Sequence, residues 1–401
     1  MPFLGILRRH PVARACAAGI FLFGFAGAAT SPYQSVIAIR ELGMGDAVYS
    51  LVIFAAAVAN VLASVAIGIF ADRRASYRRP LLVTTGLGAA GFAAVYLLPS
   101  APVFAFALVG PVAIYGASNA LYFAKAKSHE ADFTAAESEE VGTLLRMMIS
   151  LAWVLVPGLV GFALTGRASL LPAYLIAALT ALVALAVLAA GLPADRERPE
   201  GAARAGLADI RSLATPGLAL RVLATALATS VLHVNAAVLP LIVTGQAGGT
   251  AADVGVIVGY VAVIEIVFIF VWALICRRLS MPVALAVSMT LYLVYLQALA
   301  TAPGMGQVHA ASVLAGIAAA AIITLPIPYL LGLIAGRPGL SASLIAINQF
   351  LAAGIGAGIF AGGTALGGYP AAAAISGAAG LLGGVLLLAL DGWRRQPMVA
   401  Q

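Results

Sequence analysis

The chain has 401 residues, of which 63% are hydrophobic and only 9% are charged. Soluble domains carry roughly 25% charged residues, so this composition excludes an ordinary water-soluble protein. A mean hydropathy of +1.06 also excludes a disordered chain and a nucleic-acid-binding domain. We therefore expect an all-α integral membrane protein embedded in a lipid bilayer, with its formal net charge of +7 setting membrane topology.

Apolar runs of the length of a transmembrane helix, about 20 residues, recur along the whole chain. They are predicted at residues 15–39, 47–71, 80–98, 102–124, 140–165, 168–190, 217–244, 251–275, 281–301, 307–335, 340–366 and 370–390. A polar linker at residues 192–215 separates the first six runs from the last six. The sequence therefore predicts about twelve helices in two pseudo-symmetric halves, residues 1–191 and 216–401.

Lysine and arginine are unevenly distributed between the predicted loops. Nineteen lie on the side that holds both termini and the linker, two lie on the opposite side, and Arg146 falls inside a span. Loops rich in these residues stay in the cytoplasm, so both termini are expected to be cytoplasmic, in a bacterial-type inner membrane. Cys16 and Cys276 lie beside basic clusters on this side and are expected to be unpaired thiols. The acidic run at residues 130–140 is expected in a solvated cytoplasmic loop.

The loop between the second and third runs carries a glycine, an Asp-Arg pair and further arginines, in the segment GIFADRRASYRRPLL. Gly68 is expected to let two helices approach closely, and Asp72 to cap a helix or pair with basic groups. A second basic pair follows the eighth run, in CRRLSMP. This arrangement resembles the signature loop of the major facilitator superfamily, although Ala75 replaces a glycine of that pattern. The resemblance implies a conformational-switch role for Gly68, Asp72, Arg73, Arg277 and Arg278.

Other segments resemble the sugar efflux transporter family within that superfamily. They are NALYFAKAKSH at 119–129, LLRMMISLAWVLVPG at 144–158 and, more loosely, GLSASLIAIN at 339–348. The resemblance implies a monomeric secondary transporter without a cofactor that exports sugars or related small polar compounds by alternating access, in a process coupled to protons by symport or antiport. The alternatives are an exporter of drugs, amino acids or other metabolites in the same superfamily, and a membrane enzyme. The enzyme is disfavoured because the sparse acids and four histidines form no nucleophile–base or metal set.

Two formal charges fall well inside predicted spans, where each costs about 2.5–3.5 kcal/mol. Arg146 shares a helix face with Trp153 at i+7, a pairing that could hold a hydroxylated substrate, with the indole stacking on a sugar ring. Alternatively, Arg146 extends to the interface. Glu265 is the single carboxylate near the centre of a span, and an apolar environment favours its neutral form. It is therefore the proton-coupling candidate, or else a structural partner of Arg146.

The remaining polar residues within spans are candidates for substrate binding. Tyr115, Asn119 and Tyr122 share one face by their i, i+4, i+7 spacing. The resemblance implies that the first, fourth, seventh and tenth helices line a central cavity. The alternative is interhelical hydrogen bonding, worth about 0.6–2 kcal/mol. The full substrate-binding set is Gln34, Tyr115, Asn119, Tyr122, Arg146, Trp153, His233, Asn235, Tyr329 and Asn348. No metal site is expected, because His233 has no second ligand at a suitable spacing.

Overall fold

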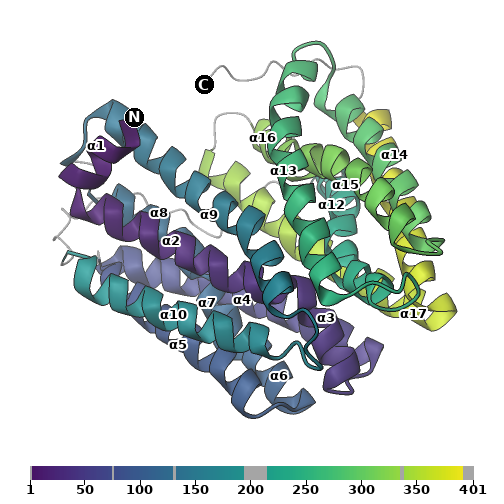
Figure 1. Cartoon of the computed structure of the whole chain (residues 1–401). Coiled ribbons are helices and arrows are strands. Elements are labelled where there is room, and N and C mark those ends of the chain that lie inside the picture. The colour runs from purple at the N-terminus through teal and green to yellow at the C-terminus, as the bar shows by residue number, and fades with distance from the viewer. Residues whose placement is uncertain (1, 75, 130–131, 194–214, 335–337, 392–401) are drawn as a thin grey trace. The chain divides into compact units, whose positions relative to one another are not determined.

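The computed structural model describes residues 2–74, 76–129, 132–193, 215–334 and 338–391 (Figure 1). Every regular element in these ranges is a helix. Eleven helical segments of this part of the chain are long and apolar enough to cross a membrane. The prediction of an all-α, multi-span architecture is confirmed, while the predicted linker at 192–215 lies almost wholly outside the described residues.

Contacts between Cα atoms divide the chain into two compact units. The first comprises Met1–Gly45 and Ala55–Glu200, and the second comprises Asp46–Phe54 and Gly201–Gln401. Residues 46–54 group with the second unit through contacts such as the hydrogen bond that Ser50 Oγ donates to Ala357 O, at 2.5 Å.

The first unit is built around α2, which packs against α9 and α10. A Cβ atom at Gly24 would lie 3.1 Å from the Cβ of Ala152, so the absence of a side chain lets α2 and α9 approach closely. Helix α5 completes this unit by packing on α10. The segments wholly or mostly in this unit are α1 Pro2–Arg9, α2 Pro11–Thr30, η1 Ser31–Tyr33, α3 Gln34–Val36, η2 Ile37–Glu41, α4 Asp46–Arg74, α5 Arg78–Leu97, α6 Ala101–Ala107, η3 Leu108–Val112, α7 Ala113–Gly116, α8 Ser118–Lys127, α9 Ala135–Ala163 and α10 Pro172–Gly191.

Helix α9 begins within the acidic run that the sequence interpretation assigned to a solvated loop. Thr134 is the N-cap, and its hydroxyl and the Glu137 carboxylate form a reciprocal capping box. Glu137 also forms a 2.8 Å ion pair with Arg9 of α1. The loop prediction is wrong from residue 135 onward, because the capping box starts the helix earlier than hydropathy suggests.

In the second unit α12 packs along α17, and α14 packs against both α15 and α17. A Cβ atom at Gly383 would lie 2.6 Å from Ala228 N and 2.7 Å from Ala224 O, so the backbones of α12 and α17 touch there. Helix α13 packs on α15. The helices of this unit are α12 Pro216–Val243, α13 Ala251–Ile275, α14 Met281–Ala300, α15 Met305–Thr324, α16 Pro326–Gly332 and α17 Pro338–Asp391.

Helix α17 contains two of the predicted spans, at 340–366 and 370–390. Its backbone leaves the helical conformation at Gly367 and Gly368, where Gly368 has a φ of 71° that residues with a side chain rarely adopt. Pro370 follows and cannot continue the preceding hydrogen-bond ladder. The chain therefore turns between two helices at the predicted position.

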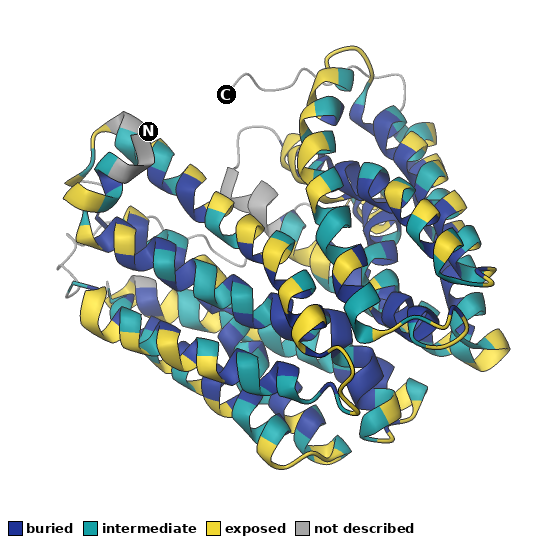
Figure 2. Cartoon of the chain, in the orientation of Figure 1, coloured by how far each residue is buried: buried dark blue, intermediate teal, exposed yellow. Residues whose placement is uncertain are grey.

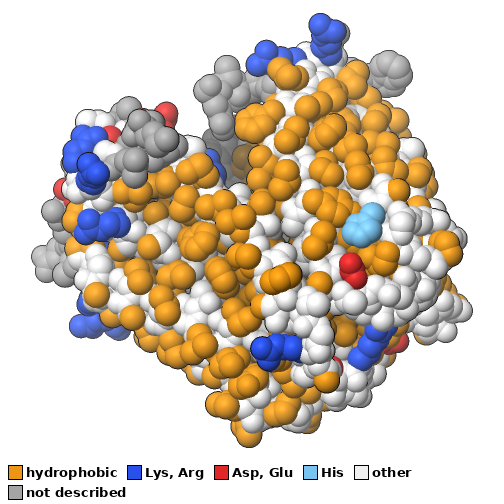
Figure 3. Space-filling view, in the orientation of Figure 1, with side chains coloured by type: hydrophobic (Ala, Val, Ile, Leu, Met, Phe, Trp, Pro, Cys, Tyr) orange, Lys and Arg blue, Asp and Glu red, His pale blue; other side chains and the backbone are white. Residues whose placement is uncertain are grey.

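The outer faces of both units are apolar. Figure 2 shows exposed residues along the outward sides of many helices, and Figure 3 shows hydrophobic side chains over most of the visible face. Phe162 and Leu366 are each 80% exposed. Exposure of such a large apolar surface to water is unfavourable, whereas lipid tails are as apolar as these side chains and can cover it.

Candidate functional site

A small cavity of about 90 Å³ lies in the second unit, among α12, α15, α16 and α17. Two of the predicted binding residues, His233 and Asn348, line it together, with Thr229 and Gln349. Asn348 Nδ2 donates a hydrogen bond to Thr229 Oγ1 at 3.2 Å. The Thr229 hydroxyl in turn donates to the carbonyl oxygen of Thr225 at 3.0 Å.

The amide oxygen of Asn348 is buried, and no described residue donates a hydrogen bond to it. Because a buried acceptor without a donor costs about 1–3 kcal/mol, this oxygen is suited to a ligand that brings a hydroxyl or N–H group. The close approach of α12 and α17 fixes the position of the site. A Cβ atom at Gly356 would lie 2.9 Å from His233 Cβ and 3.3 Å from Ser230 O.

Asn235 belongs to a different polar contact from His233, although it lies only two residues away. Tyr295 of α14 donates a hydrogen bond to Asn235 Oδ1 at 2.7 Å. The ring of Tyr295 packs edge to face against Tyr292, with centroids 5.2 Å apart. A two-residue step turns a helical side chain by about 200°, so Asn235 faces α14 and is not among the residues that line the cavity.

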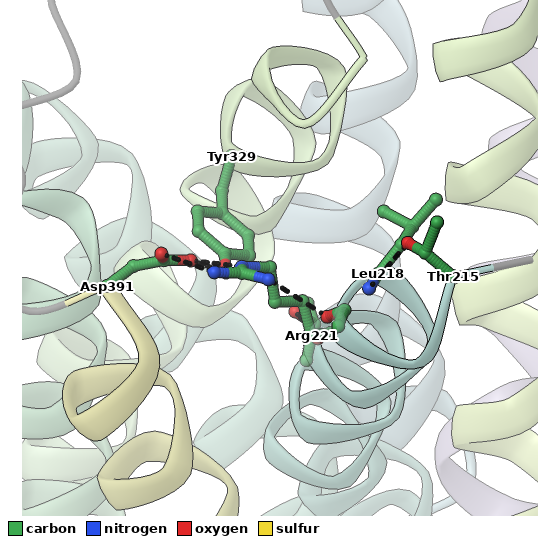
Figure 4. A network of polar contacts seen from close by, with 7 residues as sticks. Thr215, Leu218, Arg221, Tyr329 and Asp391 are labelled. Carbon is green, nitrogen blue, oxygen red and sulfur yellow. Dashed lines mark hydrogen bonds and ion pairs between the residues drawn. The ribbon is translucent and has the colours of Figure 1, made fainter. Parts of the chain in front are cut away.

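Tyr329 lies in an ionic network at one end of the second unit (Figure 4). Its hydroxyl donates a hydrogen bond to Asp391 Oδ2 at 2.9 Å. Arg221 holds the same carboxylate with two hydrogen bonds, from Nε at 2.6 Å and from Nη2 at 2.8 Å. The network joins the start of α12 to the middle of α16 and the end of α17. Sequence reasoning missed Asp391, although a lone aspartate at the end of an apolar helix is a signal for such a partner.

Glu265 lies in the middle of α13 and is half-buried. Its carboxylate makes no hydrogen bond or ion pair with any residue that the structure describes. Five residues earlier on the same helix, Tyr260 donates a hydrogen bond to the carbonyl oxygen of His309 on α15, at 3.1 Å. His309 is a second polar residue of this helix pair that the sequence interpretation did not single out.

In the first unit, Tyr115 and Tyr122 are buried in the apolar core. Their rings lie 4.9 Å and 6.1 Å from that of Phe23 on α2. Neither hydroxyl has a hydrogen-bond partner among the described residues. Asn119, at the margin of the same helical face, is exposed. The structure thus buries the two tyrosines and exposes the amide.

Arg146 and Trp153 are both exposed on α9. Arg146 forms no ion pair or hydrogen bond with the described residues, and Trp153 lies beside Gly27 of α2. The end of α2 is tied to α9 by Tyr33, whose hydroxyl donates to Pro157 O at 2.8 Å. Gln34, the next residue, is half-buried. Tyr33 is a structural contact that sequence reasoning missed, because it joins residues far apart in the chain.

The residues of the predicted switch motifs lie at helix ends. Arg73 is exposed in the last turn of α4, and Arg277 and Arg278 are exposed in the turn after α13. A Cβ atom at Gly68 would meet no described atom within 4 Å, so the expected close helix approach is not seen there. The side chain of Asp72 lies outside the described residues. Within the described ranges, His, Cys, Asp and Glu form no cluster suited to a metal ion.

Comparisons with known proteins place the chain in one family. The sequence profile of the Major Facilitator Superfamily matches residues 16–357. A protein of Deinococcus radiodurans described as a "Putative sugar efflux transporter" is 30% identical over 348 residues, covering 86% of this chain and 88% of the relative.

Solved structures show the same fold at low sequence identity. The nucleoside transporter NupG superposes with a TM-score of 0.76 at 12% identity, over 96% of this chain and all of the other. The peptide transporter POT in complex with sulfate gives 0.74 at 15% identity, over 95% and 94% of the two chains. A bacterial homologue of the human lysosomal transporter Spinster gives 0.68 at 15% identity, over 94% of each. The profile match and the shared fold lead to one conclusion: the chain is a multi-pass membrane transporter of the Major Facilitator Superfamily.

Proposed function

We propose that this transporter exports sugars or related small polar compounds in exchange for protons. It works by alternating access between the halves 1–191 and 216–401, as a monomer in a bacterial inner membrane with both termini in the cytoplasm. The observation that carries the proposal is the buried amide oxygen of Asn348, which has no donor among the described residues and belongs to a residue that lines the same cavity as His233. The relative from Deinococcus radiodurans supports the substrate class.

A sugar presents many hydroxyl groups, each of which can donate and accept a hydrogen bond. Asn348 offers an acceptor, while Gln349 and His233 add further donors and acceptors around the same space. The cavity of about 90 Å³ is smaller than a typical small-molecule site of about 300–1,000 Å³. It therefore serves as one subsite, which binds part of the substrate.

On the first unit, the candidate contact for a sugar is the exposed pair Arg146 and Trp153. An indole ring offers a flat apolar surface for the face of a sugar ring, and a guanidinium donates to its hydroxyl groups. Gln34 and Asn119 are the other accessible polar candidates of this unit. Tyr115 and Tyr122 are buried against Phe23, so we assign them to shaping the helices that carry the site.

Glu265 is proposed as the proton-coupling residue. A carboxylate at the middle of a membrane helix is costly when charged, and no described residue offsets that charge with an ion pair. Protonation removes the cost, so proton binding and a change in the polarity around α13 are thermodynamically linked.

The substrate class is tested by counterflow exchange in proteoliposomes, with a panel of labelled sugars, glycosides, amino acids and cationic drugs. Sugars should exchange, and Asn348→Leu should raise their KM by about two- to tenfold, since one neutral hydrogen bond is worth about 0.5–1.5 kcal/mol. Gln297→Leu is the matched control, because Gln297 is an exposed amide on α14 outside the cavity. Exchange of drugs or amino acids without sugars would contradict the proposal.

A further inference from the structure

A second and larger cavity, of about 620 Å³, lies within the first unit beside the turn between α4 and α5. Its volume falls in the range of about 300–1,000 Å³ that is usual for small-molecule sites. The groove runs along the end of α4 and the start of α5 and reaches Ile114 of α7. None of the candidate residues for substrate or proton binding lines it.

The walls of this groove are apolar and open. Val83 is 61% exposed, Phe70 is 47% exposed and Leu87 is 36% exposed. The hydroxyl of Thr84 is already bonded to Pro80 O at 2.9 Å and to Ser118 at 2.7 Å. Against these apolar walls a sugar would lose hydrogen bonds to water that the walls do not replace, whereas an alkyl chain would lose none.

Two arginines stand at one end of the groove. The guanidinium carbon of Arg74 lies 4.5 Å from the ring centroid of Phe70, which holds this cation over the apolar wall. Arg79 lines the same end and is exposed. Neither arginine forms a hydrogen bond or ion pair with any residue that the structure describes. The end of the groove thus carries two guanidinium groups available to an anion.

The position of these arginines matches the boundary of a membrane. The apolar span of α4 ends at Ala71 and that of α5 begins at Arg78, so the turn between them lies at one membrane surface. Leu87 is eight residues beyond Arg79 on α5, about 12 Å deeper along the helix. The groove therefore combines a cationic end at headgroup level with apolar walls at acyl-chain depth.

We propose that this groove is a binding site for one anionic phospholipid. Its phosphate is held by Arg74 and Arg79, and an acyl chain lies against Phe70, Val83 and Leu87. Guanidinium groups bind phosphate oxygens with paired hydrogen bonds, and the two charges favour a lipid of net negative charge. A zwitterionic headgroup brings its own cation to the site and gains less.

The test is native mass spectrometry of the purified full chain, with phosphatidylglycerol or phosphatidylcholine of identical acyl chains added in equal amounts. The wild type should retain phosphatidylglycerol in preference to phosphatidylcholine. Arg74→Gln combined with Arg79→Gln should remove the preference, while Arg8→Gln should keep it. Arg8 is the matched control, because it is an exposed arginine of α1 outside the groove.

A second variant tests the acyl-chain part of the site. Val83→Trp should fill the groove and reduce retention of both lipids, and its melting temperature should match that of the wild type because Val83 is exposed. Equal retention of the two lipids by the wild type would overturn the proposal. So would an Arg8→Gln variant that behaves like the double variant. Displacement of phosphatidylglycerol by millimolar inorganic phosphate would reassign the site to free phosphate and also overturn it.

Discussion

The hydrogen bond of the Tyr329 hydroxyl indicates a structural role for this residue and not the predicted role in substrate binding. The hydroxyl donates a 2.9 Å hydrogen bond to the carboxylate of Asp391, which Arg221 also binds. The side chain of Tyr329 is fully buried. The sequence indicated a polar residue in the tenth span. The lone Asp391 at the end of an apolar helix was a signal for some partner, but the sequence could not pair it with Tyr329, which lies 62 residues away. The contact depends on how α16 and α17 are rotated about their axes, which apolar periodicity does not specify.

Tyr329→Phe removes that hydrogen bond and leaves the ring in place. A hydrogen bond to a charged group is worth about 1.5–3 kcal/mol, so the melting temperature in detergent should fall. Asp391→Asn should lower it further, because Arg221 then loses its ion pair. An unchanged melting temperature for Tyr329→Phe, together with a raised KM for transport, would show that the hydroxyl contacts substrate instead.

For His233 and Asn348, the sequence identified two polar residues that the structure places in one cavity. Each was identifiable because polar residues are rare in apolar spans. That they share one cavity was not predictable, because it depends on the close approach of α12 and α17 at Gly356. Asn235 shows the converse, since its neighbour His233 points elsewhere and only helical geometry separates their roles.

At the scale of elements, the positions of apolar runs predicted the break in α17, whereas the distribution of charge gave a wrong start for α9. The predicted spans 340–366 and 370–390 leave a gap that contains the break in α17, where Gly368 has a φ of 71° and Pro370 follows two residues later. The start of α9 was missed, although Thr134 and Glu137 have the spacing of a capping box. The many acidic residues around Glu137 instead favoured the interpretation of this segment as a solvated loop.

The contact between α12 and α17 gives a stability prediction with an internal control. Gly383→Ala would place a methyl group against the backbone of Ala224 and Ala228, and overpacking of this kind costs about 1–3 kcal/mol. Gly358→Ala, in the part of α17 before its break, meets no atom within 4 Å. It should leave the melting temperature unchanged or raise it, since alanine favours helices over glycine by about 0.5–1 kcal/mol. Equal melting temperatures for the two variants would contradict this packing.

At the scale of the whole molecule, the unequal distribution of arginine and lysine makes a topology prediction. Ser76 lies in the turn between α4 and α5, and Gly304 lies in the turn between α14 and α15. The charge distribution predicts that these two turns face opposite sides of the membrane, so each residue is replaced by cysteine in turn. A membrane-impermeant maleimide added to intact cells should label Gly304→Cys and should label Ser76→Cys only after lysis. Labelling of both from outside would contradict the proposed orientation.

The native cysteines give a low background in that experiment. Cys16 is buried, and burial raises the pKa of the Cys276 thiol, which follows the end of α13. Maleimide reacts with the thiolate, so a raised pKa leaves less reactive Cys276 at neutral pH. Its labelling should stay slow at pH 7 and increase as the pH is raised.

The most direct test of the proposed mechanism is sugar transport driven by a pH gradient in proteoliposomes, compared between the wild type and Glu265→Gln. Glutamine resembles the protonated carboxyl group in shape and cannot change its charge. The wild type should accumulate substrate against its gradient, and Glu265→Gln should lose this accumulation while it keeps counterflow exchange. Full accumulation of substrate by Glu265→Gln would contradict a proton-coupling role for Glu265.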